Sequence, residues 1–95
     1  MNRLKYNLYS DDMIDTMIPA VKKVYPQQNY CLEVHFLNGE HGILNMQPYL
    51  DFGVFKRLKD TQIFQQVRVS FDTLEWQVGV DLDPEFVYQK TDKTA

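Results

Sequence analysis

The clearest pattern along the chain is a strict alternation of apolar and polar residues at 30–36. Such alternation places the two sets of side chains on opposite faces of a β-strand. Asn38-Gly39, which follows this segment, is typical of a tight hairpin turn because both residues tolerate positive φ angles. We therefore predict a β-hairpin over residues 30–46 with one buried face.

Two registers of this hairpin are possible, and they differ in consequence. A two-residue turn places Val34 opposite Ile43, whereas a three-residue loop with a bulge at the glycine places His35 opposite His41 and Glu33 opposite Ile43. Moving the register by one residue sends a whole set of side chains to the other face. We favour the first register because Val34 and Ile43 then share an apolar face. Only the second would pair the histidines and open a route to a metal site with Glu33.

Other segments extend the predicted sheet. Residues 18–25 alternate imperfectly and predict an edge strand beside the hairpin, since consecutive strands tend to pair. Residues 67–71 and 74–78 carry apolar side chains at every second position and predict a second hairpin. A turn at Asp72-Thr73 puts three apolar cross-strand pairs on one face, namely Phe71 with Leu74, Val69 with Trp76 and Val67 with Val78.

Two short helices are predicted. Val54 and Leu58 have the spacing of one helical face, which indicates a helix over residues 54–60 that docks on the sheet. Asp83, Pro84 and Glu85 together are typical of a helix start. The predicted fold is therefore an α+β domain: a small antiparallel sheet built from two β-hairpins plus a preceding strand, with two short helices.

The length of 95 residues and the hydrophobic content of 44% are sufficient for one core. We assign residues 1–16 to an N-terminal extension, 17–89 to the α+β domain and 90–95 to a disordered polar tail. The single cysteine, Cys31, excludes an internal disulfide bond and disfavours a cysteine-based zinc site. No apolar run approaches the ~20 residues of a membrane span, and no secretory signal is visible, so we expect a cytoplasmic protein without a membrane partner.

The residues that could support catalysis or bind a metal ion do not form a recognisable enzyme site. His35 and His41 are the only imidazoles, and the favoured register sends them to opposite faces of the sheet. The acidic residues Asp81, Asp83 and Glu85 lack the glycine and the later glutamate of a calcium loop. We therefore predict no catalytic residues, no bound metal and no cofactor.

A protein-binding role is the favoured function. Tyr49 and Phe52 lie in a loop beside Pro48, where exposed aromatic rings are natural anchors for a partner. Asp11 and Asp12 add acidic candidates, and the net charge of −3 suits a basic partner. Open sheet edges also favour a homodimer.

The alternative function is a nucleic-acid-associated regulatory protein. It would use a Lys/Arg patch formed by Lys22, Lys56, Arg57 and Lys59. The negative net charge makes this alternative the weaker one, because binding to duplex DNA usually requires a basic face that neutralises phosphates.

The order of these motifs resembles the small bacterial family known as domain of unknown function 2442. The matching segments are Val21–Tyr25, Tyr30–Phe36, Asn38–Glu40, Leu44–Leu50, Gly53–Leu58 with Asp60 and Phe64, Val67–Val69, Trp76, and Asp81–Glu85 with Tyr88. The chain departs from the family pattern at Asn45, where an aspartate is usual, and at Gln77, where a proline often follows the tryptophan.

This resemblance implies an α+β domain with no established reaction and no established ligand. Some relatives look joined to a helix-turn-helix domain, and others look like neighbours of small toxin-like proteins. By similarity, we expect a regulatory or antitoxin-like binding module whose partner is a basic, toxin-like protein.

Overall fold

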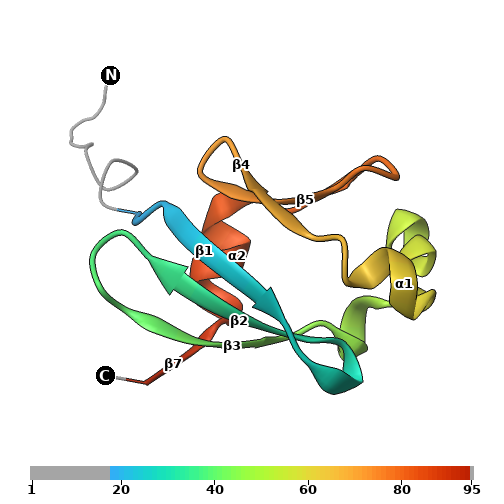
Figure 1. The fold of residues 1–95 in the computed structure, drawn as a ribbon, viewed down its shortest axis with the longest axis horizontal. Helices are drawn as coiled ribbons and strands as arrows, with labels where there is room; N and C mark the ends of the chain where they lie inside the picture. The colour runs from blue at the N-terminus through green and yellow to red at the C-terminus, as the bar shows by residue number, and fades with distance from the viewer. Residues whose placement is uncertain (1–17, 95) are drawn as a thin grey trace.

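Two antiparallel sheets share one hydrophobic core in the computed structural model, which describes residues 18–94 (Figure 1). The four-stranded sheet has the order β1-β2-β3-β7, with β1 Val21–Pro26, β2 Cys31–Phe36, β3 His41–Asn45 and β7 Asp92–Thr94. The three-stranded sheet has the order β4-β5-β6, with β4 Arg68–Ser70, β5 Thr73–Trp76 and β6 Val80–Asp81. The predicted α+β class, with two hairpins and a preceding strand, is confirmed, although the strands divide into two sheets.

The first hairpin, β2–β3, has the register that we did not favour. His35 pairs with His41, and Glu33 pairs with Ile43. The loop contains three residues and ends at Gly39, whose φ of 93° is the left-handed conformation that such a bulged loop requires. The two histidines therefore lie on the same face of the sheet, and the prediction that they lie on opposite faces is wrong.

The favoured register failed because Ile43 does not belong to the buried face. Ile43 is 41% exposed, while Gly42 occupies the buried position opposite Val34. A Cβ atom at Gly42 would lie 2.0 Å from the carbonyl oxygen of Asp92 in β7. The missing side chain at Gly42 thus makes room for a neighbouring strand, which the pattern of apolar residues does not show.

The second hairpin, β4–β5, turns one residue earlier than predicted. Its two turn residues are Phe71 and Asp72, with φ angles of 49° and 70°, and Val69 pairs with Leu74. Thr73 belongs to the strand, where its buried hydroxyl donates a 2.7 Å hydrogen bond to the carbonyl of Leu82. Phe71, which we expected in the apolar face, is 93% exposed.

Helical segments connect and cover the sheets. The predicted helix over residues 54–60 is a 3₁₀ helix, η4 Gly53–Lys59, and the short α1 Thr61–Phe64 follows it. Two further 3₁₀ turns are η2 Gln28–Tyr30 and η3 Gln47–Tyr49. Helix α2 Pro84–Lys90 begins as predicted, because the Asp83 carboxylate accepts a 2.8 Å hydrogen bond from the Glu85 amide.

The polar C-terminal residues form a strand where we expected a disordered tail. Thr91 is buried, and the residues that follow it form β7, which pairs with β3 through His41 with Thr94 and Ile43 with Asp92. The backbone of β7 supplies these contacts, so the polar side chains gave no signal of the strand. In the part of the chain that the structure describes, no helix combines the length and apolar character needed to cross a membrane.

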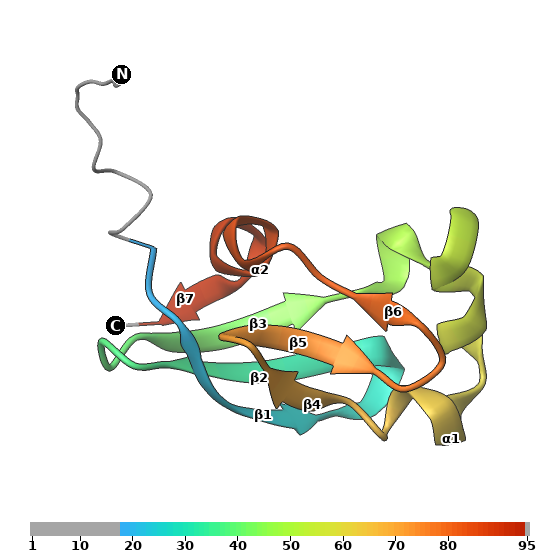
Figure 2. The ribbon, with the colours of Figure 1, turned by 90° about the horizontal axis from the view of Figure 1, so that it is seen from above.

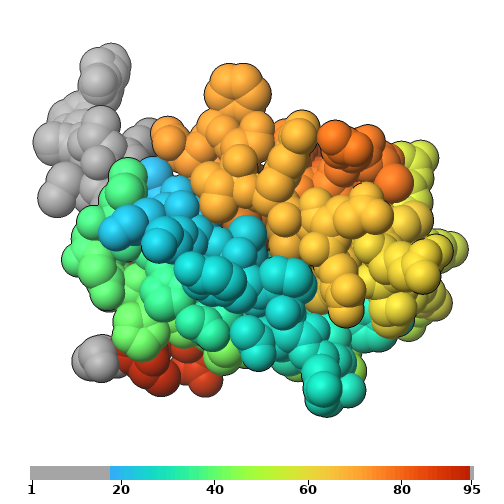
Figure 3. Space-filling view, in the orientation of Figure 1, coloured from blue at the N-terminus to red at the C-terminus, as the bar shows by residue number. Residues whose placement is uncertain are grey.

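The core lies between the two sheets and α2, which contacts both β3 and β5 (Figure 2). Trp76 is its largest fully buried side chain, and its indole nitrogen donates a 2.8 Å hydrogen bond to the carbonyl of Phe64. The two sheets also meet at the start of β1, where the Val21 amide donates to the Asp72 carbonyl at 3.0 Å. In the space-filling view β1 crosses the face between the first hairpin and β4 (Figure 3).

Candidate functional site

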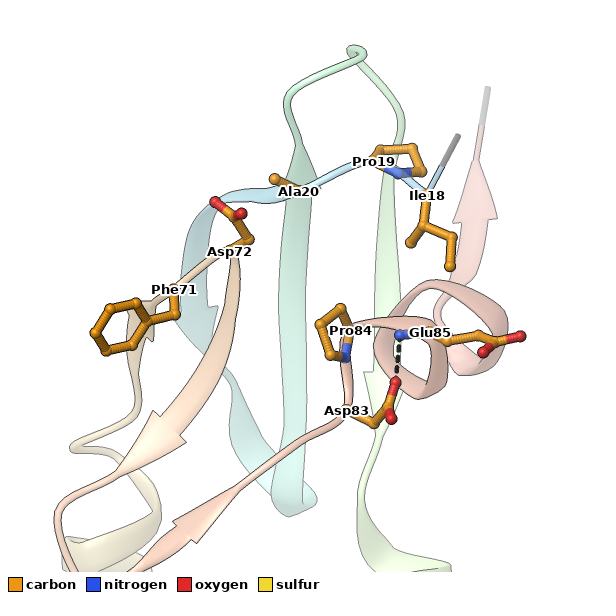
Figure 4. A pocket seen from close by; sticks show the side chains of 8 residues that line it. All are labelled: Ile18, Pro19, Ala20, Phe71, Asp72, Asp83, Pro84 and Glu85. Atoms are coloured by element: carbon orange, nitrogen blue, oxygen red, sulfur yellow. Dashed lines mark hydrogen bonds between the residues drawn. The ribbon is translucent and has the colours of Figure 1, made fainter. Parts of the chain in front are cut away.

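Three segments that are far apart in the sequence meet at one hollow on the surface, which we call the acidic groove (Figure 4). Its volume is about 420 Å³. The segments are the approach to β1, the turn between β4 and β5, and the start of α2. The lining residues are Ile18, Pro19, Ala20, Phe71, Asp72, Asp83, Pro84 and Glu85.

The lining combines apolar surface with negative charge. Ile18, Pro19, Ala20 and Pro84 supply the apolar part, and three carboxylates stand among them (Figure 4). The Asp83 carboxylate is partly committed to capping α2. Because no basic side chain among residues 18–94 lines the groove, its chemistry suits a cationic group carried on an apolar segment.

Phe71 stands at the rim of this groove with its ring turned away from the cavity (Figure 4). A bulky residue with a φ of 49° is in a sparsely populated region of backbone conformation. Such a conformation costs on the order of 1–3 kcal/mol, and residues in such conformations cluster at active sites and ligand-binding sites. Sequence reasoning missed this residue because the alternating pattern counted Phe71 as part of the core.

Of the residues predicted for partner binding, Tyr49 and Phe52 lie in one turn, where the Phe52 amide donates a 3.2 Å hydrogen bond to the Tyr49 carbonyl. Tyr49 is half-buried and packs edge-to-face on Phe86, with ring centroids 5.0 Å apart, so it supports the core. Phe52 is 65% exposed, so it is accessible to a partner and is still a predicted contact residue. Asp11 and Asp12 lie outside the described residues.

The predicted Lys/Arg patch is divided and partly engaged. Lys59 forms a 2.6 Å ion pair with Asp51, and Arg57 donates a 2.7 Å hydrogen bond to the carbonyl of Val78. The hydrogen bond from Lys59 also lowers the pKa of the Asp51 carboxyl. Lys56 shares η4 with Lys59 and Arg57.

Lys22 lies at the other end of the molecule from this helix. It is the second residue of β1, and β1 begins at the end opposite to α1, which directly follows η4 (Figures 1 and 2). These four basic residues therefore do not form one surface for a phosphate backbone.

A second group of chemistry-bearing side chains lies on the exposed face of the four-stranded sheet, which we call the outer face. The His35 and His41 rings stack with centroids 5.2 Å apart. The Nε2 atom of His35 lies 2.6 Å from a carboxylate oxygen of Glu33, and Tyr25 packs edge-on against the His35 ring. The three-residue loop at Gly39 was the signal for this group, since the competing register of the hairpin contains it.

A third cluster ties the first hairpin to α2 and β7. The Tyr88 hydroxyl donates to the Glu40 carboxylate, which also accepts a 2.7 Å hydrogen bond from the Asn38 amide. These two hydrogen bonds lower the pKa of Glu40, and the bond to Glu40 raises the pKa of Tyr88. Lys93 lies over the Tyr88 ring, 4.1 Å from its centroid. Each member is occupied by another, so we assign this cluster a structural role.

Among residues 18–94, no three side chains of His, Cys, Asp or Glu converge as a group that would hold a metal ion. The outer face thus supplies two imidazoles with one adjoining carboxylate, and the acidic groove supplies carboxylates without imidazoles.

We compared the chain with family models, curated proteins and solved structures to identify the family to which it belongs. No curated protein and no solved structure matches the chain. The family model described as "Protein of unknown function (DUF2442)" matches residues 21–92, from the start of β1 into β7. Since this match covers most of the 95 residues and confirms the resemblance seen in the sequence, the chain belongs to the DUF2442 family.

Proposed function

We propose that this protein is a non-enzymatic binding module that docks on another protein through Phe71 and the adjoining acidic groove. The observation that carries the proposal is Phe71, a residue that is 93% exposed while its backbone has a φ of 49°. A buried contact with a partner would compensate for an exposed aromatic ring in this position. Aromatic side chains are also among the most frequent anchors of protein interfaces.

The turn holds Phe71 in a defined place before binding. Asp72 carries the Val21 hydrogen bond that joins the two sheets, and Thr73 is fixed by its buried bond to Leu82. A ring on a restrained turn loses little backbone entropy when it is bound, and this limits the free energy that association costs.

The carboxylates of the groove indicate the charge of the partner. Asp72, Asp83 and Glu85 line the same hollow as Phe71, so a partner with basic residues beside an apolar surface would be complementary. We accordingly propose a regulatory or antitoxin-like role in the bacterial cytoplasm, with a basic, toxin-like protein as partner.

The test is capture of the partner from cells of the native organism, with the full chain as bait and compared with two variants. Phe71→Ala should abolish capture, whereas Phe52→Ala, which removes another exposed aromatic ring, should leave it intact if docking is confined to the groove. Reversal of charge through Asp72→Lys with Glu85→Lys should also abolish capture, and the wild-type complex should weaken as salt is raised.

Two results would contradict the proposal. One is recovery of the wild-type protein from the cell extract at low salt without a bound partner protein. The other is capture that survives both Phe71→Ala and the charge reversal, because the contact surface would then lie elsewhere.

A further inference from the structure

The outer face holds a pair of imidazoles that the proposed docking surface does not use. His35 and His41 are direct cross-strand partners. The neighbouring pair, Phe36 and Glu40, is hydrogen-bonded through the Phe36 amide at 2.8 Å. Bonded and non-bonded pairs alternate in an antiparallel ladder, so the two histidines occupy a non-hydrogen-bonded pair, where side chains approach most closely.

Each imidazole uses one ring nitrogen and leaves the other for a ligand. In His35 the Nε2 atom meets Glu33 at 2.6 Å, which leaves Nδ1. In His41 the Nδ1 atom lies 3.4 Å from the Thr94 hydroxyl, which leaves Nε2. A histidine that binds a metal ion through one nitrogen almost always has a carboxylate, carbonyl or water on the other, and the Glu33–His35 pair has this form.

The pair is also open to solvent. The side chains of His35 and Glu33 are 32% and 38% exposed, so a hydrated ion can reach them. The rings are stacked at an interplanar angle of 20°, and the nitrogen lone pairs lie in the ring planes. Binding of one ion by both rings therefore requires them to turn about their Cβ–Cγ bonds, and this torsion has broad preferences in histidine.

We propose that His35 and His41 together bind a divalent transition-metal ion such as Zn²⁺, for which neutral imidazole is a preferred ligand. Water completes the coordination, because Glu33 is engaged with the other nitrogen of His35 and no three His, Cys, Asp or Glu side chains among the described residues form a group that could hold an ion. Glu33 acts as a positioning residue that orients the His35 ring. This site is independent of Phe71 and of the acidic groove.

The positive charge of one neighbouring residue disfavours the binding of a cation. Lys23 in β1 is the cross-strand partner of His35, so its positive charge belongs to the same face. Removal of this charge through Lys23→Gln should strengthen metal binding, because like charges near a site reduce the affinity for a cation. A merely structural histidine pair would show no such response.

The experiment is calorimetric titration of the metal-stripped, tag-free full chain with zinc chloride. We expect one ion per chain, a loss of at least tenfold in affinity for His35→Ala and for His41→Ala, and a loss of about 10–100-fold for Glu33→Gln. Asn45→Ala, an exposed change on the same strand as His41, should leave the affinity unchanged. All these residues are exposed or half-exposed, and circular dichroism checks that each variant is folded.

A spectroscopic measurement identifies the ligands directly. Paramagnetic resonance of the Cu²⁺-loaded protein should show coupling to two imidazole nitrogens in the wild type and to one in each single variant. The proposal is overturned if the wild type binds no zinc at micromolar concentration. It is equally overturned if the His35→Ala and His41→Ala variants bind zinc as tightly as the wild type, because the ion would then have other ligands.

Discussion

The two hairpins of this domain place different kinds of residue at the left-handed positions of their turns. The β2–β3 loop gives its left-handed position to Gly39, for which a φ of 93° carries no penalty from a side chain. The β4–β5 turn gives both of its left-handed positions to residues with side chains, Phe71 and Asp72. The first turn is therefore relaxed, whereas the second stores strain at Phe71 of the kind that costs about 1–2 kcal/mol.

This difference separates a structural turn from a candidate functional one. The strained turn persists because the strand that follows it is anchored by buried groups, Trp76 on the carbonyl of Phe64 and Thr73 on the carbonyl of Leu82. A rigid support of this kind lets a protein hold a large apolar ring in water. The relaxed turn instead brings Glu40 to Tyr88, where it strengthens the fold.

The largest expected effect comes from removal of the support of the second hairpin. Trp76→Ala should destabilise the protein by about 3–5 kcal/mol, because it leaves a cavity and an unpaired Phe64 carbonyl. Urea unfolding followed by far-ultraviolet circular dichroism measures the change. Val69→Ala, a truncation at a partly exposed position of β4, is the control and should cost much less. A similar loss for both variants would mean that Trp76 is not the anchor.

The relaxed turn should become strained when its glycine is replaced. Apart from Gly39 and its two chain neighbours, no atom of the described residues lies within 4 Å of a Cβ placed on Gly39, so Gly39→Ala acts through backbone conformation alone. We expect a loss of about 1–2 kcal/mol in the free energy of unfolding, measured by thermal denaturation. An unchanged stability would show that the first loop tolerates the strain as well as the second.

The strained turn should gain from the opposite change. Phe71→Gly removes the steric penalty at a φ of 49° and should stabilise the protein. The expected gain in the free energy of unfolding is at most about 1 kcal/mol, because glycine loses more conformational freedom on folding than phenylalanine does. The same variant should lose capture of the partner. A gain in stability together with a loss of binding would be the signature of a residue kept for function, and a loss of both would contradict our comparison.

The smallest expected effect is on the stability of the protein at acidic pH. Hydrogen bonds from Tyr88 and Asn38 lower the pKa of Glu40 below its ordinary value of 4.5. The contribution of this carboxylate is therefore complete above about pH 4.5 and is lost as the pH falls through the lowered pKa. Glu40→Gln should reduce the dependence of the melting temperature on pH below 4.5 and leave its slope near neutrality unchanged. A slope that stays the same in acid would assign the effect to Asp51 or Glu75, whose pKa values are also lowered.

The sequence was informative where side chains alone determine the structure. The alternation in β2 predicted its buried face, and Asp83-Pro84 predicted the start of α2. The register of the first hairpin depended on whether Gly39 closes a two- or a three-residue loop, and apolar matching pointed to the wrong answer. Strand β7 depends on backbone bonding and on the space that Gly42 leaves, and neither has a signature in the pattern.

The candidate sites were still harder to predict. The acidic groove joins residues 18–20, 71–72 and 83–85, which only the tertiary fold brings together. The histidine pair was present among the alternatives, but it required the register that apolar matching disfavoured.

Trp76 is the only tryptophan in the chain, and it lies fully buried against the carbonyl of Phe64. Selective excitation of this ring therefore gives an optical reporter, without any added label, of the layer formed by β5 and α1. Separation of β7 from β3 on the far side of the molecule would leave its emission nearly unchanged. A mismatch between this emission and the circular dichroism signal would thus reveal that the two sheets open in separate steps.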